Sequence, residues 1–312
     1  MSSTGDSDES SVRIICGPTG AGKSAIAMRL AESTDALIIS ADSRQIYRGF
    51  DIGTAKPSVD DRRRVPHRGI DVVDPTERYS AARWAEQAHE WIAEATALGR
   101  TPVIVGGTGF YLRALTEPLF ESPVLDPVRR AALERALARI DTETLRRWCG
   151  NLDPDRAHLG RTQLVRSIET AILTGHRLSD LHRTRARAPS VQGRYLVVDP
   201  GARLAVRIER RFDAMIDEGW PDEVSALSRT VDRDAPAWKA SGYVAVREMV
   251  EGRLTREQTR ERVIIETRQY AKRQRTWFRH QLDDDVVTRI DPEDASTETI
   301  LNDWWAGRKT HA

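Results

Sequence analysis

The chain has 312 residues, which is enough for one large domain or two smaller ones. Charged residues make up 30% of it, the net charge is +1, and no apolar run approaches the roughly 18 residues of a membrane-spanning helix. Two cysteines and a start without a leader argue against a disulfide framework, structural zinc and a signal peptide, and favour a cytoplasmic protein. Residues 1–11 are rich in Ser, Asp, Glu and Gly, so we predict a disordered tail there.

Residues 17–24 read GPTGAGKS and fit the phosphate-loop pattern G-x-x-x-x-G-K-[ST]. An apolar strand pattern precedes them at 12–16 and an Ala-rich helical run follows at 25–31, which is the context that this motif needs. The loop is typical of nucleotide-binding and ATP-binding proteins, and it predicts a di- or triphosphate ligand without identifying it. The predicted phosphate-binding residues are Gly17, Thr19, Gly20, Ala21, Gly22, Lys23 and Ser24, and the Ser24 hydroxyl suits Mg²⁺.

Buried-strand patterns continue at residues 36–40, 102–105 and 195–198, with helical patterns between them, including one at 81–98. Alternating strands and helices predict an α/β fold whose core is a P-loop NTPase-like parallel sheet. Between the third and fourth strands, Leu and Ile recur at helical spacing. We therefore predict a catalytic core formed by residues 12–112 and 191–312, and a mostly helical insertion at 113–190.

Polar residues follow the second and third predicted strands, where ligands of open α/β sheets bind. Asp42 follows the second strand. Its carboxylate could act as a general base, as a Mg²⁺ ligand or only as a helix or turn cap. Thr108 follows the third strand among three glycines, which either form a turn or let a ligand approach the hydroxyl closely. This strand lacks the terminal Asp of many ATPases. Its absence favours a transferase, in which the phosphate is the leaving group or the group by which the substrate is bound, over an ATPase.

The net charge conceals two basic segments. Residues 126–189 hold thirteen arginines against eight Asp and Glu residues, and residues 256–280 hold eight Lys and Arg against three Glu, so each segment carries +5. A polyanion and a pair of solvated helical faces explain these segments equally well. Arg207 and Arg211, four residues apart, either clamp a diphosphate or lie on a solvated face.

Six segments, at 17–24, 41–57, 66–75, 102–115, 207–224 and 267–279, together resemble the bacterial tRNA dimethylallyltransferases, the isopentenyl-diphosphate:tRNA transferase family. The resemblance implies that dimethylallyl diphosphate donates its five-carbon group to N6 of the adenine next to the anticodon, position 37, and that diphosphate leaves. It also implies Mg²⁺ as the cofactor, the tRNA anticodon stem-loop as the partner and a flipped adenine in a channel through the core. We expect a monomer.

The resemblance assigns roles to individual residues. It implies that Asp42 is the general base, that Thr108 assists across the channel, and that Arg211, with Arg207 nearby, stabilises the diphosphate. Ser43 and Gln45 would read the flipped base. The full set of expected tRNA-binding residues is Asp42, Ser43, Arg44, Gln45, Thr108, Arg130, Gln163, Arg166, Lys239, Gly242, Tyr243, Lys272 and Arg273.

The sequence departs from the family pattern in two places. At 159–169 the usual Asn-Asp pair is missing and Gln163 replaces an Arg, while 238–244 keeps only the Gly-Tyr pair clearly.

Other hypotheses for the function are an isopentenyltransferase that uses free AMP, ADP or ATP, a phosphate-loop kinase of a small metabolite and a non-catalytic RNA-binding protein. The insertion and the basic C-terminal helix count against the first of these.

Overall fold

The computed structural model describes residues 11–117, 123, 125–184 and 191–308. The chain divides into two compact units, which we call the core unit (residues 1–116 and 190–312) and the helical unit (residues 117–189). Apart from Ser11, the predicted tail lies outside the described residues. In these described ranges, no helix is both long and apolar enough to pass through a lipid bilayer.

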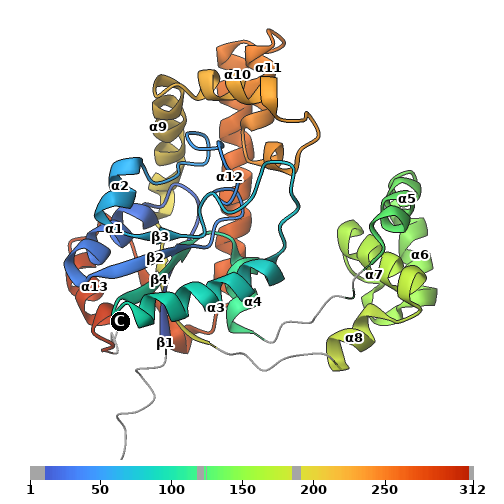
Figure 1. Ribbon diagram of the computed structural model, residues 1–312, viewed down its shortest axis with the longest axis horizontal. Helices are drawn as coiled ribbons and strands as arrows, with labels where there is room; N and C mark the ends of the chain where they lie inside the picture. Colours follow the sequence, from blue (N-terminus) through green and yellow to red (C-terminus); the bar gives the residue numbers. More distant parts are fainter. Residues whose placement is uncertain (1–10, 118–122, 124, 185–190, 309–312) are drawn as a thin grey trace, which may run out of the picture. The chain divides into compact units, whose positions relative to one another are not determined.

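The core unit is built on a parallel sheet, which over the described residues has six strands in the order β3-β2-β4-β1-β5-β6 (Figure 1). The strands are β1 (Ser11–Cys16), β2 (Ala36–Ser40), β3 (His67–Arg68), β4 (Thr101–Gly106), β5 (Gln192–Val198) and β6 (Val287–Ile290). This confirms the predicted α/β fold and all four predicted strands. β3 and β6 were not predicted, because β3 has two residues and β6 has two polar residues, Thr288 and Arg289, between its apolar ends.

Helices cover both faces of this sheet, which explains why its central strands are apolar on both sides. On one face, Ile15 and Leu196 pack in a cluster with Leu30 of α1 (Lys23–Thr34) and Trp304 of α13 (Thr297–Trp305). On the other lies α3 (Ala81–Ala97), whose buried Trp84 donates its indole N–H to the Ser40 carbonyl at 2.9 Å. α4 (Gly109–Thr116) packs on α3, so the helical unit begins at residue 117 instead of the predicted 113.

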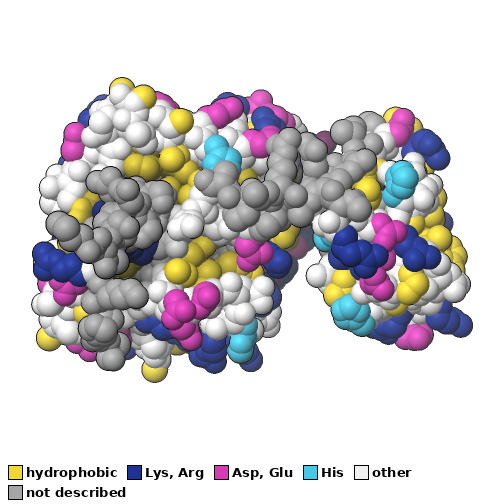
Figure 2. All heavy atoms as spheres, turned by 90° about the horizontal axis from the view of Figure 1, so that it is seen from below, with side chains coloured by type: hydrophobic (Ala, Val, Ile, Leu, Met, Phe, Trp, Pro, Cys, Tyr) yellow, Lys and Arg dark blue, Asp and Glu magenta, His cyan; other side chains and the backbone are white. Residues whose placement is uncertain are grey.

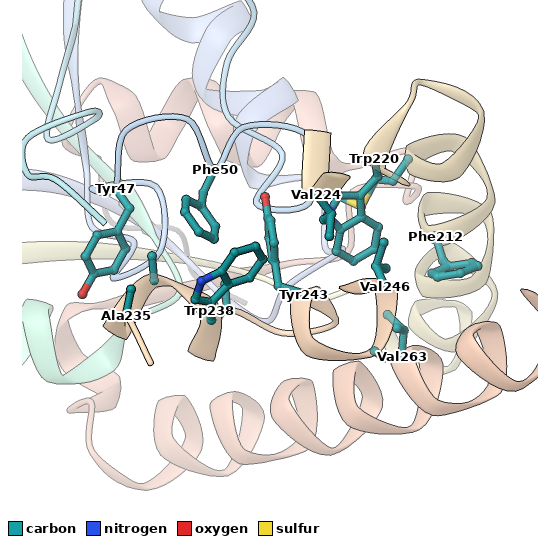
Figure 3. Close-up of a cluster of buried hydrophobic side chains, with 14 of the residues drawn as sticks. Tyr47, Phe50, Phe212, Trp220, Val224, Ala235, Trp238, Tyr243, Val246 and Val263 are labelled. Atoms are coloured by element: carbon teal, nitrogen blue, oxygen red, sulfur yellow. The ribbon is translucent and has the colours of Figure 1, made fainter. Parts of the chain in front are cut away.

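A second hydrophobic core lies among the C-terminal helices of the core unit. They are α9 (Leu204–Asp217), α10 (Trp220–Thr230), α11 (Tyr243–Val250) and the long α12 (Arg256–His280), and the short α2 (Val59–Arg64) precedes β3. Figure 3 shows Phe50, Trp220, Trp238 and Tyr243 side by side in this core. The Tyr243 ring packs against the other three rings, with centroids 4.8–6.3 Å apart, so the loop that carries Phe50 is fixed to these helices.

The helical unit consists of α5 (Pro127–Ala138), α6 (Thr142–Leu152), α7 (Arg161–Thr174) and α8 (Leu178–Thr184). Its own small core contains Leu137, Leu145, Cys149, Leu164 and Ile168. Gly175 follows α7 and takes the left-handed conformation typical of a residue that caps a helix C-terminus (φ 74°).

Candidate functional site

The phosphate loop connects β1 to α1 with its backbone close to the end of β5. Gly17 has φ 143°, and a Cβ atom added there would lie 2.2 Å from the Val198 carbonyl oxygen, so only glycine fits. Gly22, also with positive φ, precedes α1, and no side chain caps the first N–H groups of this helix. These groups and the helix dipole create a local positive potential that favours an anion at this position.

Lys23 lies at the centre of the charged groups around this loop. Its ammonium group donates a hydrogen bond to the Pro18 carbonyl at 2.8 Å. Burial lowers the pKa of Lys23 from 10.5 to about 8, a shift that the Asp42 carboxylate opposes and the Arg211 guanidinium reinforces. The loop, the end of β2 and α9 therefore bring three charged side chains together.

The segments that follow β2 and β4 are hydrogen-bonded to each other. Thr108 donates its backbone N–H to the Ala41 carbonyl at 3.2 Å, and its hydroxyl oxygen accepts the Ser43 N–H at 3.1 Å. Asp42 accepts the Arg44 N–H through Oδ1 at 2.8 Å. Among the described residues no donor reaches Asp42 Oδ2, so this oxygen remains available to take a proton.

Two cavities meet at this position. One has a volume of about 440 Å³ and the other about 240 Å³, and the residues that line both are Thr19, Asp42, Thr54, Arg211 and Tyr270. The smaller cavity also contains Lys23 and Ser24. The larger contains Arg44, Lys239 and Arg273. A compound in one cavity and a compound in the other would both reach Asp42.

The two predicted diphosphate arginines differ in position. Arg211 lines both cavities, and burial lowers its pKa while Asp42 raises it. Arg207 donates to the Gly20 carbonyl at 3.0 Å and pairs with Glu293 at 2.9 Å. Arg207 lines neither cavity and instead supports the phosphate loop from outside.

Sequence reasoning missed two residues of α12 at the junction of the cavities. Tyr270 lines both, and burial together with Asp42 raises its pKa to about 12. Gln274 accepts the Thr19 N–H and donates to the Gly107 carbonyl, both at 2.8 Å. The only sequence signal was their four-residue spacing, which places both on one face of a helix.

The glycines around Thr108 were expected either to form a turn or to let a ligand approach closely. Gly106 and Gly107 line the smaller cavity, while protein atoms fill the space that side chains at Gly107 and Gly109 would need. A Cβ atom added at Gly107 would lie 2.3 Å from Gln274 Nε2, and one at Gly109 would lie 2.3 Å from the Trp277 ring. These glycines let α12 pack directly on the loop after β4.

Some of the predicted RNA-binding residues are buried or hydrogen-bonded within the protein. Tyr243 is fully buried and donates to Glu223 at 2.7 Å, so direct contact with RNA is at odds with its position. Gly242 is buried as well, and a Cβ atom there would lie 2.5 Å from Trp220. The Gln45 amide bonds the Ser40 hydroxyl at 2.9 Å and the Thr54 and Ala55 carbonyls at 3.3 and 3.0 Å, so it would have to give up these bonds to read a base.

The helical unit carries three of the predicted residues. Partial burial of the Arg166 guanidinium group, together with the neighbouring Arg130, lowers the pKa of Arg166. Arg130 pairs with the buried Glu169 at 3.4 Å. Gln163, which replaces an Arg of the family pattern, accepts the Gly160 N–H at 3.1 Å and stabilises the start of α7.

Most cations of α12 are neutralised within the protein. Acidic partners bind Arg256, Arg260, Arg262, Arg268 and Arg275. Lys272, Arg273 and Arg279 are exposed, and no carboxylate of the described residues pairs with them. Basic and acidic side chains are likewise interspersed on the face seen in Figure 2. The basic segment therefore offers three free cations to a polyanion.

Comparisons with known proteins find family models, sequences and structures that are similar to this chain. The family model for IPP transferase matches residues 45–281, and the model for isopentenyl transferase matches 10–68. The tRNA dimethylallyltransferases of Alkalilimnicola ehrlichii and Halorhodospira halophila are 42% and 41% identical, over 91% and 93% of this chain and 92% and 96% of theirs.

Solved structures are similar as well. The tRNA isopentenylpyrophosphate transferase of Bacillus halodurans is 30% identical, with 96% of each chain covered and a TM-score of 0.67. A eukaryotic dimethylallyltransferase acting on tRNA is 25% identical, with 97% of this chain and 81% of that chain covered and a TM-score of 0.79.

Proposed function

The chain belongs to the IPP transferase family, and from this premise we propose that it transfers the dimethylallyl group of dimethylallyl diphosphate to N6 of the tRNA adenine next to the anticodon, position 37. Diphosphate is the leaving group. One observation carries the proposal: two cavities of different character meet at the Asp42 carboxylate. A transferase that joins a small donor to a large acceptor needs such an arrangement.

The smaller cavity suits the donor. The uncapped N-terminus of α1 and the Lys23 ammonium bind the diphosphate, and Arg211 reaches the same space. Apolar atoms of Met28, Ile38 and Val105 line the cavity as well and accommodate the five-carbon chain. As the C–O bond to the diphosphate breaks, negative charge grows on the leaving group, and the two cations stabilise it.

A divalent cation fits this donor site. In the described ranges, no three His, Cys, Asp or Glu side chains gather to hold a metal by themselves. The Ser24 hydroxyl lines the smaller cavity, and one hydroxyl together with diphosphate oxygens and water is a ligand set that Mg²⁺ accepts. We therefore propose Mg²⁺, held by Ser24, which when bound offsets the charge of the diphosphate.

Asp42 performs the proton transfer. An exocyclic adenine amine is a poor nucleophile, because the ring withdraws its lone pair. As the N6–carbon bond forms, the free Oδ2 of Asp42 takes the N6 proton. Thr108 holds the Asp42 segment in place through the Ala41 and Ser43 backbone, which keeps the base at the junction of the cavities.

The larger cavity suits the flipped adenine and its flanking phosphates. Its walls combine apolar side chains, among them Phe212 and Ile264, with the cations Arg44, Lys239 and Arg273. A base stacks on apolar walls while cations hold the backbone. We further propose that the helical unit, through Arg130 and Arg166, binds the anticodon stem-loop.

The test is a transfer assay with labelled dimethylallyl diphosphate and Mg²⁺, offering unmodified tRNA or AMP as acceptor. We expect label on tRNA at a single adenine. Label on AMP alone would assign the protein to free-nucleotide prenylation. ATP hydrolysis without prenyl transfer would point to a kinase.

A further inference from the structure

Gln274 occupies a position that the proposed reaction does not explain. Its side chain is 7% exposed and lies on α12, the helix that also carries the free cations. The amide oxygen accepts the N–H of Thr19 in the phosphate loop, and the amide nitrogen donates to the Gly107 carbonyl after β4. One side chain thus bridges the phosphate loop and the end of the neighbouring strand.

This bridge uses groups that would otherwise face an anion. Backbone N–H groups are what a phosphate loop offers to phosphate, and the Thr19 group is already bound. Gly107 has no side chain, and Gln274 Nε2 fills the space where a Cβ atom would lie. The slot between the loop and β4 is therefore built to hold this amide.

The position of Gln274 can be compared with the way in which phosphate loops bind nucleotides. Such a loop cradles two phosphates, and a third phosphate extends beyond it. β1 and β4 are adjacent and parallel, with Cys16 opposite Gly106, so the space beyond the loop on this side is bounded by the end of β4. The Gln274 amide lies between the loop and this strand end, where it bonds Thr19 and Gly107, and it forms part of the wall of the smaller cavity.

We propose that Gln274 is a specificity-determining residue that restricts the phosphate loop to diphosphates and excludes triphosphates. The inference rests on the proposed function, because it explains how a loop typical of ATP-binding proteins is kept for a prenyl diphosphate. Specificity arises here by obstructing the wrong ligand.

The experiment measures binding of inorganic diphosphate and of inorganic tripolyphosphate by calorimetry, with Mg²⁺ present, to the full-length protein and to Gln274→Ala. We expect the unaltered protein to bind diphosphate at least about tenfold more tightly. In Gln274→Ala the preference should shrink to about threefold or less, because tripolyphosphate binds more tightly. The matched control is Thr276→Ala, an exposed position of the same helix that should keep the original preference.

Two results would overturn the inference: equal affinity of the unaltered protein for both anions, or an unchanged preference in Gln274→Ala. If Gln274→Ala does not fold, as judged by circular dichroism, Gln274→Ser is measured in the same way, because it is smaller and stays polar. The binding ratio does not depend on prenyl transfer. A protein that prefers diphosphate but fails to modify tRNA would contradict the proposed function and leave this inference standing.

Discussion

The Tyr243 hydroxyl donates a hydrogen bond of 2.7 Å to Glu223 Oε1, and the other oxygen of that carboxylate accepts the backbone N–H groups of Asp51 and Ile52 at 2.9 and 2.7 Å. A single carboxylate on α10 thereby holds a buried aromatic residue and the loop that follows Phe50. That loop continues into Thr54, which lines both cavities. Glu223 and Tyr243 therefore position part of the site without lining either cavity themselves.

Removal of the Tyr243 hydroxyl should weaken this support. We expect Tyr243→Phe to lower the free energy of unfolding by about 1–2 kcal/mol, because the ring stays in place while Glu223 loses one donor. Chemical denaturation measures the change. A double-mutant cycle with Glu223→Gln should give a coupling of at least about 0.5 kcal/mol. Strictly additive effects would show that the two side chains do not support each other.

Most of the fold was predictable because its signals are local. Continuous apolar runs marked the central strands, and the helical spacing of Leu204, Ile208 and Phe212 marked α9. β3 and β6 lack such runs, since short edge strands bury few side chains. They form because β2 and β5 provide unpaired edges, which is a long-range effect that no local pattern reports.

The candidate site could also be predicted only in part, where its signals are local. The phosphate loop and the strand ends at Asp42 and Thr108 were found from a motif and from the geometry of parallel sheets. Tyr270 and Gln274 were not found, because their role depends on the packing of α12 against the phosphate loop and the end of β4. Both of those segments are far from α12 in the sequence. Tyr243 was placed at the RNA surface because a shared motif does not distinguish a residue that faces a ligand from one that packs beneath it.

The thiol of Cys16 provides a test of burial beside the phosphate loop. Burial raises its pKa from 9.0 to about 12, so the thiolate fraction at pH 8 should be about 1,000-fold smaller than in the unfolded chain. We expect an aromatic disulfide reagent to label Cys16 only after denaturation, with peptide mapping as the readout. Rapid labelling of the native protein would contradict the buried position.

The same shift predicts how this group affects stability at high pH. The folded chain keeps the Cys16 proton between pH 9 and 12, while the unfolded chain releases it. The contribution to stability is therefore complete below pH 9 and is lost as the pH rises toward 12. Cys16→Ala should show a smaller decrease in unfolding free energy over this range than the unaltered protein.

Asp42 is the residue on which the proposed chemistry depends most. We expect Asp42→Ala to bind tRNA within a few-fold of the unaltered protein but to transfer the prenyl group about a hundredfold or more slowly, because no other group takes the N6 proton. Single-turnover assays with saturating tRNA measure this step directly. Asp60→Asn, at an exposed position of α2, is the control for loss of a carboxylate. A near-normal rate in Asp42→Ala would remove Asp42 from the role of base.

The free cations of α12 should determine how tRNA binding responds to salt. Each cation that neutralises a phosphate contributes about 0.7–0.9 to the slope of log affinity against log salt concentration. We expect the combined change of Lys272, Arg273 and Arg279 to Gln to reduce that slope by about 2.

Matched controls come from the same helix. Arg260→Gln and Arg268→Gln also remove positive charges, but Asp213 and Glu209 already neutralise these arginines, so the slope should change little. Filter binding at 50–300 mM salt, about the range over which such slopes are linear, gives each value. If the two sets of variants lowered the slope equally, net charge would govern binding and the three unpaired cations would have no special part in it.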